Sequence, residues 1–226
     1  MIEIIPAIIP KNLEDLEEKM SSVRKLVPLV QVDVLDGSLV PARSWPYQSS
    51  SKPDTFFEHI VKEQEGFPFW QELEFEAHLM VREPERIISD WIAAGATRII
   101  VQLEGVSDFQ KLFDVVDGKV PLGVALALDT PIEKLTPIVE KIEAIQCMGW
   151  NFKELGHQGR PFDERTFDTI RRLRELYPTV ILSVDGGVNL ENAPKLIEAG
   201  VSRLVVGSAI FASDNPTETI KTFQNL

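Results

Sequence analysis

The hydrophobic positions of this chain form short β-branched runs that alternate with longer segments of helical periodicity. The short runs predict eight strands, at residues 2–9, 29–35, 74–80, 98–103, 121–127, 144–148, 180–184 and 203–206. The longer segments predict helices at residues 12–25, 55–63, 84–94, 107–116, 131–141, 164–176 and 190–199, and a last one from about residue 217. This alternation is typical of a parallel sheet whose strands are connected by helices.

Eight strand-helix pairs predict an α/β fold in which one parallel eight-stranded sheet closes into a (β/α)8 barrel. Because no Ser/Gly-rich linker and no break in composition interrupt the pattern, we expect residues 1–226 to form one domain. The alternative is an open, doubly wound sheet, but no Gly-x-Gly-x-x-Gly follows the first strand. Two long segments, residues 36–54 and 149–162, follow strands and should lie at the C-terminal face of the barrel.

Composition narrows the class of protein further. Apolar residues make up 44% of the 226 residues, enough for a large core, and no apolar run approaches the ~18 residues of a membrane span. The first six residues predict a strand rather than a signal peptide, and the single cysteine, Cys147, fits a reducing compartment, so we expect a cytoplasmic protein. The net charge of -12 argues against nucleic acid and anionic membranes as partners. The sequence does not determine the oligomeric state, and a homo-oligomer is one of the alternatives.

Candidate chemistry is found where the predicted strands end. The run from Ile181 to Val184 stops at Asp185, which Gly186 and Gly187 follow, and a carboxylate beside bare backbone amides is typical of a barrel site. Alternation along the second strand places Gln31, Asp33 and Leu35 on one side.

The third strand likewise places His78 and Met80 on one face. The ends of barrel strands converge, so Asp33, His78 and Asp185 could meet around one Zn²⁺, Mn²⁺ or Fe²⁺ ion, with Gln31 near it. The alternative for His78 is a buried core residue, and for Asp33 a turn former at a strand end.

A phosphate site is the second candidate. Gly186 and Gly187 follow the seventh strand, and Gly207 and Ser208 follow the eighth, the two loops where barrels often bind phosphate. Backbone amides can hold a phosphate without any excess of basic residues, so the acidic composition does not oppose such a site. Two ordinary glycine turns are the alternative.

Five blocks in order along the chain resemble the ribulose-phosphate 3-epimerase family. They are Val32-Asp33-Val34-Leu35-Asp36-Gly37 with Val40-Pro41, Ala77-His78-Leu79-Met80-Val81 with Glu83-Pro84-Glu85-Arg86, Gly123-Val124-Ala125-Leu126, Val184-Asp185-Gly186-Gly187-Val188, and Val206-Gly207-Ser208-Ala209-Ile210-Phe211. The resemblance implies a TIM barrel that binds a small phosphorylated sugar and catalyses a metal-assisted 1,1-proton transfer at carbon 3 of a ketose 5-phosphate.

The same resemblance implies roles for single residues. Asp33 and Asp185 would remove and return the proton on opposite faces of the substrate. A divalent ion held by Asp33, His78 and Asp185 would stabilise the enediolate. Met80 and Met148 match methionines that pack over the reacting carbons, with barrel filling as the alternative.

The chain departs from the family at several positions. Gln31 stands where the family has a metal-binding His, so metal affinity should fall or the preference should move towards harder ions. Ala7 replaces a substrate-contacting Ser. The loop after the sixth strand keeps Asn151 and Gln158 but loses glycines that offer amides to phosphate, a role that His157 or Arg160 could take over. Leu35 and Ala127 replace a family Met and Asn.

Two further functions remain as alternatives. One is a phosphosugar-binding protein without turnover, which the changes at Gln31 and Ala7 favour. The other is a phosphosugar lyase or decarboxylase on a related barrel. The latter enzymes resemble Asp-x-Lys-x-x-Asp on the second strand, whereas Leu35 and Ser38 stand at those positions counted from Asp33.

Overall fold

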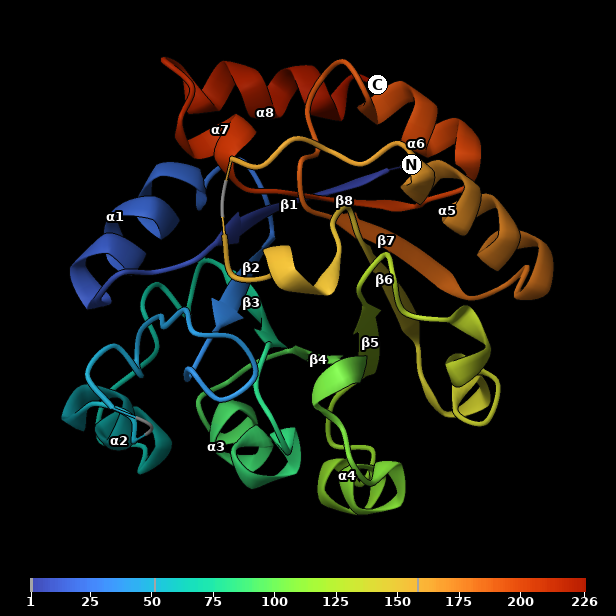
Figure 1. Cartoon of the computed structure of the whole chain (residues 1–226). Coiled ribbons are helices and arrows are strands. Elements are labelled where there is room, and N and C mark those ends of the chain that lie inside the picture. Colours follow the sequence, from blue (N-terminus) through green and yellow to red (C-terminus); the bar gives the residue numbers. More distant parts are fainter. Residues whose placement is uncertain (1, 51, 158) are drawn as a thin grey trace.

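The computed structural model describes residues 2–50, 52–157 and 159–226. Its eight parallel strands form a closed barrel in chain order, and the last strand pairs with the first (Figure 1). The strands are β1 (Glu3–Ile8), β2 (Leu29–Val34), β3 (Glu74–Leu79), β4 (Arg98–Gln102), β5 (Leu122–Leu126), β6 (Ala144–Met148), β7 (Ile181–Asp185) and β8 (Arg203–Val206). The predicted (β/α)8 barrel is therefore confirmed.

The helices lie outside the ring of strands (Figure 1). The α-helices are α1 (Leu13–Val23), α2 (Thr55–Val61), α3 (Ile88–Ala93), α4 (Phe109–Val116), α5 (Arg165–Leu176), α6 (Ala193–Ala199), α7 (Ser208–Phe211) and α8 (Pro216–Gln224). Four of them begin where an Asn or Asp side chain accepts a hydrogen bond from the backbone N–H three residues later, at Asn12, Asp54, Asp108 and Asn215. Within the described residues, no helix is long and apolar enough to cross a membrane.

The helix expected at residues 131–141 is not an α-helix. The segment forms two short 3₁₀ turns, η3 (Ile132–Leu135) and η4 (Val139–Lys141). Pro137 lies in the middle of the segment and has no N–H for an α-helical bond, which explains the interruption. The apolar periodicity was nevertheless informative, because Ile132, Leu135 and Ile138 are buried. Three further 3₁₀ turns are η1 (Pro84–Arg86), η2 (Leu103–Gly105) and η5 (Phe152–Glu154).

Alternation along the strands separates two packed regions. On β2, Val30, Val32 and Val34 belong to the large apolar cluster that includes residues of the surrounding helices. Leu35 instead packs in a smaller cluster with Met80 and Met148. The prediction that Gln31 and Asp33 share the side of Leu35 therefore puts them inside the barrel, where both are buried.

A buried ion-pair network lies where the strands begin, at the end of the barrel opposite the candidate site. Arg203 of β8 is 2% exposed and pairs with Glu76 of β3 and, at 2.9 Å, with Glu3 of β1. Arg98 of β4 also reaches Glu76, with Nη1 2.8 Å from Oε2. The Arg203–Glu76 pair connects β8 with β3, which are not neighbours in the ring, so the network crosses the interior of the barrel.

Candidate metal and substrate site

Three buried side chains meet inside the C-terminal end of the barrel. Asp33 and His78 are opposite each other in the β2–β3 register, and Asp185 ends β7. The Nδ1 atom of His78 lies 3.3 Å from Oδ1 of Asp33 and 3.6 Å from Oδ2 of Asp185. The predicted convergence of these three strand ends is therefore present in the structure.

The side-chain amide of Gln31 bridges the two carboxylates. Its Nε2 donates hydrogen bonds of 2.8 Å to Oδ1 of Asp33 and 2.8 Å to Oδ2 of Asp185. Gln146 of β6 adds a hydrogen bond of 3.1 Å to the same Asp185 oxygen. In the part of the chain that the structure describes, no donor reaches the buried Oε1 of Gln31. An unpaired buried carbonyl oxygen is costly, so this atom is a candidate ligand.

The cluster shifts the pKa values of its members. Burial alone would lower the pKa of His78, but hydrogen bonds to Asp185 and Asp33 outweigh it and raise this pKa to about 10. Burial raises the pKa of Asp33 to about 6; the hydrogen bond to His78 opposes this rise and the charge of Asp185 adds to it. In the metal-free protein, the contacts with the two carboxyl groups therefore favour the imidazolium form of His78 over the neutral ring.

The residues fit a divalent cation. One ligand atom each from Asp33, His78 and Asp185 lie within 4.8 Å of one another. The amide of Gln31 would supply a fourth ligand, its unpaired oxygen, after a 180° rotation that exchanges nitrogen and oxygen. Two carboxylates, one imidazole and an amide oxygen are suitable ligands for Zn²⁺, Mn²⁺ or Fe²⁺.

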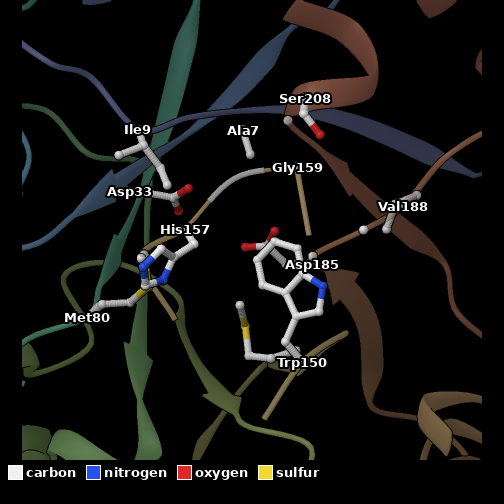
Figure 2. A pocket seen from close by; sticks show the side chains of 15 residues that line it. Ala7, Ile9, Asp33, Met80, Trp150, His157, Gly159, Asp185, Val188 and Ser208 are labelled. Carbon is white, nitrogen blue, oxygen red and sulfur yellow. The ribbon is translucent and has the colours of Figure 1, made fainter. Parts of the chain in front are cut away.

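A pocket opens above this cluster, and the other predicted site residues line it. Asp33 and Asp185 both extend into it (Figure 2). The remaining predicted residues in its wall are Met80, Met148, Gly186, Gly187, Gly207 and Ser208. Ala7, one of the positions at which the sequence departs from the family resemblance, also lines the pocket. All the proposed catalytic and phosphate groups therefore face a single cavity.

The two glycines after β7 have a steric function whatever they bind. Gly186 and Gly187 have φ values of 106° and 70°, which residues with a Cβ rarely adopt. A Cβ on Gly187 would lie 2.8 Å from the backbone of Phe162, and one on Gly186 would lie 3.1 Å from the ring of Trp150. The segment after β6 therefore packs directly on this turn.

The described residues of that segment, 149–157 and 159–162, also cover the pocket. Trp150 and His157 line the cavity (Figure 2), and the Trp150 indole is held by a 3.0 Å hydrogen bond from Nε1 to the carbonyl of Pro161. Arg160 pairs with Glu154 instead, at 3.3 Å. Gln158, which the family resemblance pointed out, lies outside the described residues. The cavity left beneath the segment has a volume of about 30 Å³, room for about two water molecules.

Sequence reasoning missed three polar residues around His78. Gln102 at the end of β4 accepts a hydrogen bond from the ring, with 3.1 Å between its Oε1 and Nε2 of His78, and Gln102 in turn donates to Glu104. Gln146 approaches Nδ1 of the same ring at 3.4 Å. Alternation could have found Gln146, which lies two residues before Met148 on β6 and is fully buried.

The fold and the site together define a (β/α)8 barrel with a buried Asp-His-Asp cluster at its C-terminal face. The chain belongs to the ribulose-phosphate 3 epimerase family, whose model matches residues 3–211. This confirms the resemblance carried by the five sequence blocks.

Curated relatives match nearly the whole chain at low identity. Ribulose-phosphate 3-epimerase of Schizosaccharomyces pombe is 29% identical over 225 residues, covering 99% of this chain and 92% of the relative. The chloroplastic ribulose-5-phosphate-3-epimerase of Arabidopsis thaliana is 30% identical over 230 residues, covering 97% and 75%. The enzyme of Bacillus subtilis is 27% identical over 227 residues, covering 97% of each.

Solved structures with the same fold are more distant in sequence. 3-Hexulose-6-phosphate synthase of Salmonella typhimurium superposes with a TM-score of 0.71 at 15% identity, covering 99% of this chain and 97% of that one. 3-Keto-L-gulonate-6-phosphate decarboxylase of Vibrio cholerae gives 0.70 at 16%, covering 100% and 95%. At this identity the likeness supports the barrel fold alone.

Proposed function

We propose that this protein is an epimerase that moves a proton at carbon 3 of a ketose phosphate, with ribulose 5-phosphate and xylulose 5-phosphate as the first pair to test. The observation that carries the proposal is the position of Asp33 and Asp185. Two carboxyl groups from β2 and β7 enter one pocket and share a buried imidazole. An epimerase without a redox cofactor can use such a pair, with one group to remove a proton and one to return it on the other face.

The environment of the two carboxyl groups suits this exchange. In the metal-free protein, burial raises the pKa of Asp33 to about 6, which makes its carboxylate a stronger base than that of an exposed aspartate. His78 touches both groups and lies in the barrel below the pocket. When it carries a proton, the imidazole compensates part of the negative charge of the two carboxylates. Met80 and Met148 provide apolar walls that exclude water from the reacting carbon.

A divalent ion is the cofactor that the site would hold, through Asp33, His78, Asp185 and the amide oxygen of Gln31. When bound, the ion supplies positive charge near the substrate oxygens on which negative charge develops. The phosphate of the substrate would bind to the backbone amides of the residues after β7 and β8 that line the pocket, Gly186, Gly187, Gly207 and Ser208.

The small cavity volume has a consequence for binding. A ketose phosphate is far larger than the two waters that fit in the cavity, so we expect Trp150 and His157, which line it, to move when substrate binds. Since the segment packs on Gly186 and Gly187, its movement would also uncover the amides that we assign to phosphate.

Deuterium exchange tests the proposal directly. The protein is loaded with Mn²⁺ or Zn²⁺ and incubated in D₂O with ribulose 5-phosphate, and the products are followed by NMR. We expect xylulose 5-phosphate, with deuterium at carbon 3 of both sugars. Neither product nor deuterium with either metal would exclude this substrate pair, and the same assay on other ketose phosphates would define the range.

A phosphosugar-binding protein without turnover is the second candidate function. The bridging contact of Gln31 favours it, because an amide already occupies the space between the carboxylates. Turnover that disappears in Asp185→Asn while the sugar phosphate still binds would exclude this candidate.

A further inference from the structure

Beyond the residues that face the pocket, a chain of side-chain hydrogen bonds extends from His78 to the loop after β5. The Nε2 atom of His78 lies 3.1 Å from Oε1 of Gln102, and Nε2 of Gln102 lies 2.5 Å from Oε2 of Glu104. The other carboxylate oxygen of Glu104 accepts from the backbone N–H of Ala127, at 3.0 Å, and from the hydroxyl of Thr130. None of these partners lines the pocket.

The backbone N–H of Ala127 fixes which groups donate and which accept along this series of hydrogen bonds. The N–H of Ala127 can only donate, and an ionised carboxylate can only accept, so Glu104 presents acceptors on both sides. Gln102 must therefore turn its NH₂ group towards Glu104, because the opposite rotation would place its carbonyl oxygen against the carboxylate.

The same donor and acceptor argument decides which nitrogen of His78 carries a hydrogen. With its NH₂ group engaged, Gln102 offers His78 a carbonyl oxygen, which can only accept. The Nε2 atom of His78 must then carry a hydrogen. Its Nδ1 atom faces Asp33 and Asp185 and is the nitrogen whose lone pair becomes available when a cation replaces the proton there.

We propose that Gln102 and Glu104 are positioning residues, which hold the His78 ring in one orientation with a hydrogen on Nε2 and Nδ1 turned to the two aspartates. The expected effect on metal affinity rests on the proposed function. The orientation of the His78 ring and the hydrogen on Nε2 rest on hydrogen-bond geometry alone. Neither residue touches substrate; both act through His78. Groups that orient a metal-binding imidazole in this way typically contribute 10–100-fold in metal affinity.

A swap of the two residues provides the sharpest test. Glu104→Gln makes the direction of the chain ambiguous, and Gln102→Glu sets two carboxylates against each other. The double variant Q102E/E104Q restores a consistent chain. The new carboxylate at position 102 would accept from His78 and from the new amide at position 104, whose oxygen would in turn accept from Ala127 and Thr130.

Two single variants complete the set. Gln102→Met removes the acceptor of the His78 hydrogen at nearly constant volume. Gln110→Met is the matched control, since the Gln110 amide donates to Asp114 on the exposed surface of α4.

The first readout is NMR of protein labelled with ¹⁵N-histidine. The chain has three histidines, so three imidazoles are observed, and a His78→Gln spectrum identifies the buried one. We expect a hydrogen on Nε2 of His78 that exchanges slowly with water in the parent protein, in Q110M and in the swap. Exchange should be roughly tenfold or more faster in E104Q and Q102M. An unprotonated Nε2 in the parent, or unchanged exchange in Q102M, would overturn the proposal.

The second readout is the affinity for Mn²⁺ alone, measured by EPR without substrate. E104Q and Q102M should bind it about 10–100-fold more weakly than the parent, and the swap should recover most of the loss. Equal affinity in all variants with unchanged melting temperatures would contradict a positioning role. If the parent binds no Mn²⁺ or Zn²⁺, the metal part of the proposed function fails, and the Nε2 hydrogen still decides this inference.

Discussion

The Nε2 atom of Gln31 lies 2.8 Å from Oδ2 of Asp185 and 2.8 Å from Oδ1 of Asp33, and it donates a hydrogen bond to each. An amide thus stands where a cation shared by two carboxylates would be expected, and its carbonyl oxygen is left without a donor among the described residues. A cation bound between the carboxylates would repel the NH₂ group of Gln31 and attract its carbonyl oxygen. The amide would then rotate, and its oxygen would gain a partner.

Gln31→His should strengthen zinc binding. An imidazole is a better ligand for Zn²⁺ than a neutral amide oxygen, so we expect the Kd to fall by roughly tenfold or more, about 1.4 kcal/mol. Metal analysis of the purified protein and competitive titration with a chelator provide the measurement. Gln31→Met is the matched control and should lower the affinity. Equal zinc content in all three proteins would mean that residue 31 is not a ligand.

Asp33→Asn and Asp185→Asn should separate proton exchange from epimerisation. Each removes one proton-transfer group, so net epimerisation should fall by about 10²–10⁴-fold. The remaining carboxylate can still exchange the carbon 3 proton of the epimer that faces it, so each variant should deuterate a different epimer. Asp168→Asn makes the same charge change on an exposed side chain of α5 and should behave as the parent. Loss of exchange with both epimers in one variant alone would indicate a single-base mechanism.

Metal affinity should rise with pH. The pKa of His78 is raised to about 10, so the proton on Nδ1 competes with a cation at every lower pH. One proton is released for each ion bound, and the logarithm of the association constant should rise by about one per pH unit between pH 6.5 and 8.5. Below pH 6, where Asp33 also takes up a proton, the slope should steepen.

Titration with Mn²⁺ at several pH values measures this slope. His78→Gln is the control, and it should lower the affinity and flatten the slope between pH 6.5 and 8.5. A slope that stays the same in His78→Gln would assign the competing proton to another group.

Gly187→Ala should cost more stability than Gly118→Ala. Both glycines have positive φ, 70° and 68°, so both substitutions carry the backbone cost of about 1–3 kcal/mol. At Gly118 nothing lies within 4 Å of the added Cβ, whereas at Gly187 it would lie 2.8 Å from the backbone of Phe162. We expect a further loss of about 1–3 kcal/mol for Gly187→Ala in urea unfolding. An equal loss of unfolding free energy in the two variants would show that the segment around Phe162 can move away from the added Cβ without destabilising the protein.

Arg203→Met should destabilise the barrel, and a second substitution should recover part of the loss. Removing Arg203 leaves the buried Glu76 with Arg98 as its cationic partner, which should cost about 3–5 kcal/mol in urea unfolding. In Glu76→Gln/Arg203→Met, the charge that Arg203 compensated is also removed, so the double variant should be more stable than the single one. A double variant as unstable as the single one would show that Arg203 contributes packing rather than charge compensation.

The residues that meet at the strand ends were predictable from one periodicity and one rule of topology. Alternation on β2 and β3 gives the sides of Gln31, Asp33 and His78, and closure of a parallel barrel brings such ends together. Helical periodicity was less reliable at residues 131–141, where it predicted the buried side chains correctly but not the backbone conformation. Pro137 interrupts the hydrogen bonds of a helix without changing which side chains face the core.

Contacts made by amides were harder to predict. Gln102 and Gln146 are neutral residues within apolar strands, and only the three-dimensional structure reveals that both approach one imidazole. Glu104 lies two residues beyond Gln102, past the end of β4, so its carboxylate could not be placed by alternation. The cover over the pocket depends on how residues 149–162 pack on Gly186 and Gly187, a tertiary contact without local signal.

The pairing of β8 with β1 also sets an order of events during folding. Arg203 and Glu3 are 200 residues apart in sequence, so the last seam of the ring can close only after nearly the whole chain has left the ribosome. Until then Glu3 and Glu76 lack the guanidinium of Arg203, and the exposed edge of β1 has no strand to pair with. A partly synthesised chain therefore carries an open sheet edge that could pair with another molecule, and a nascent chain that ends before residue 203 is the stage at which we expect aggregation to begin.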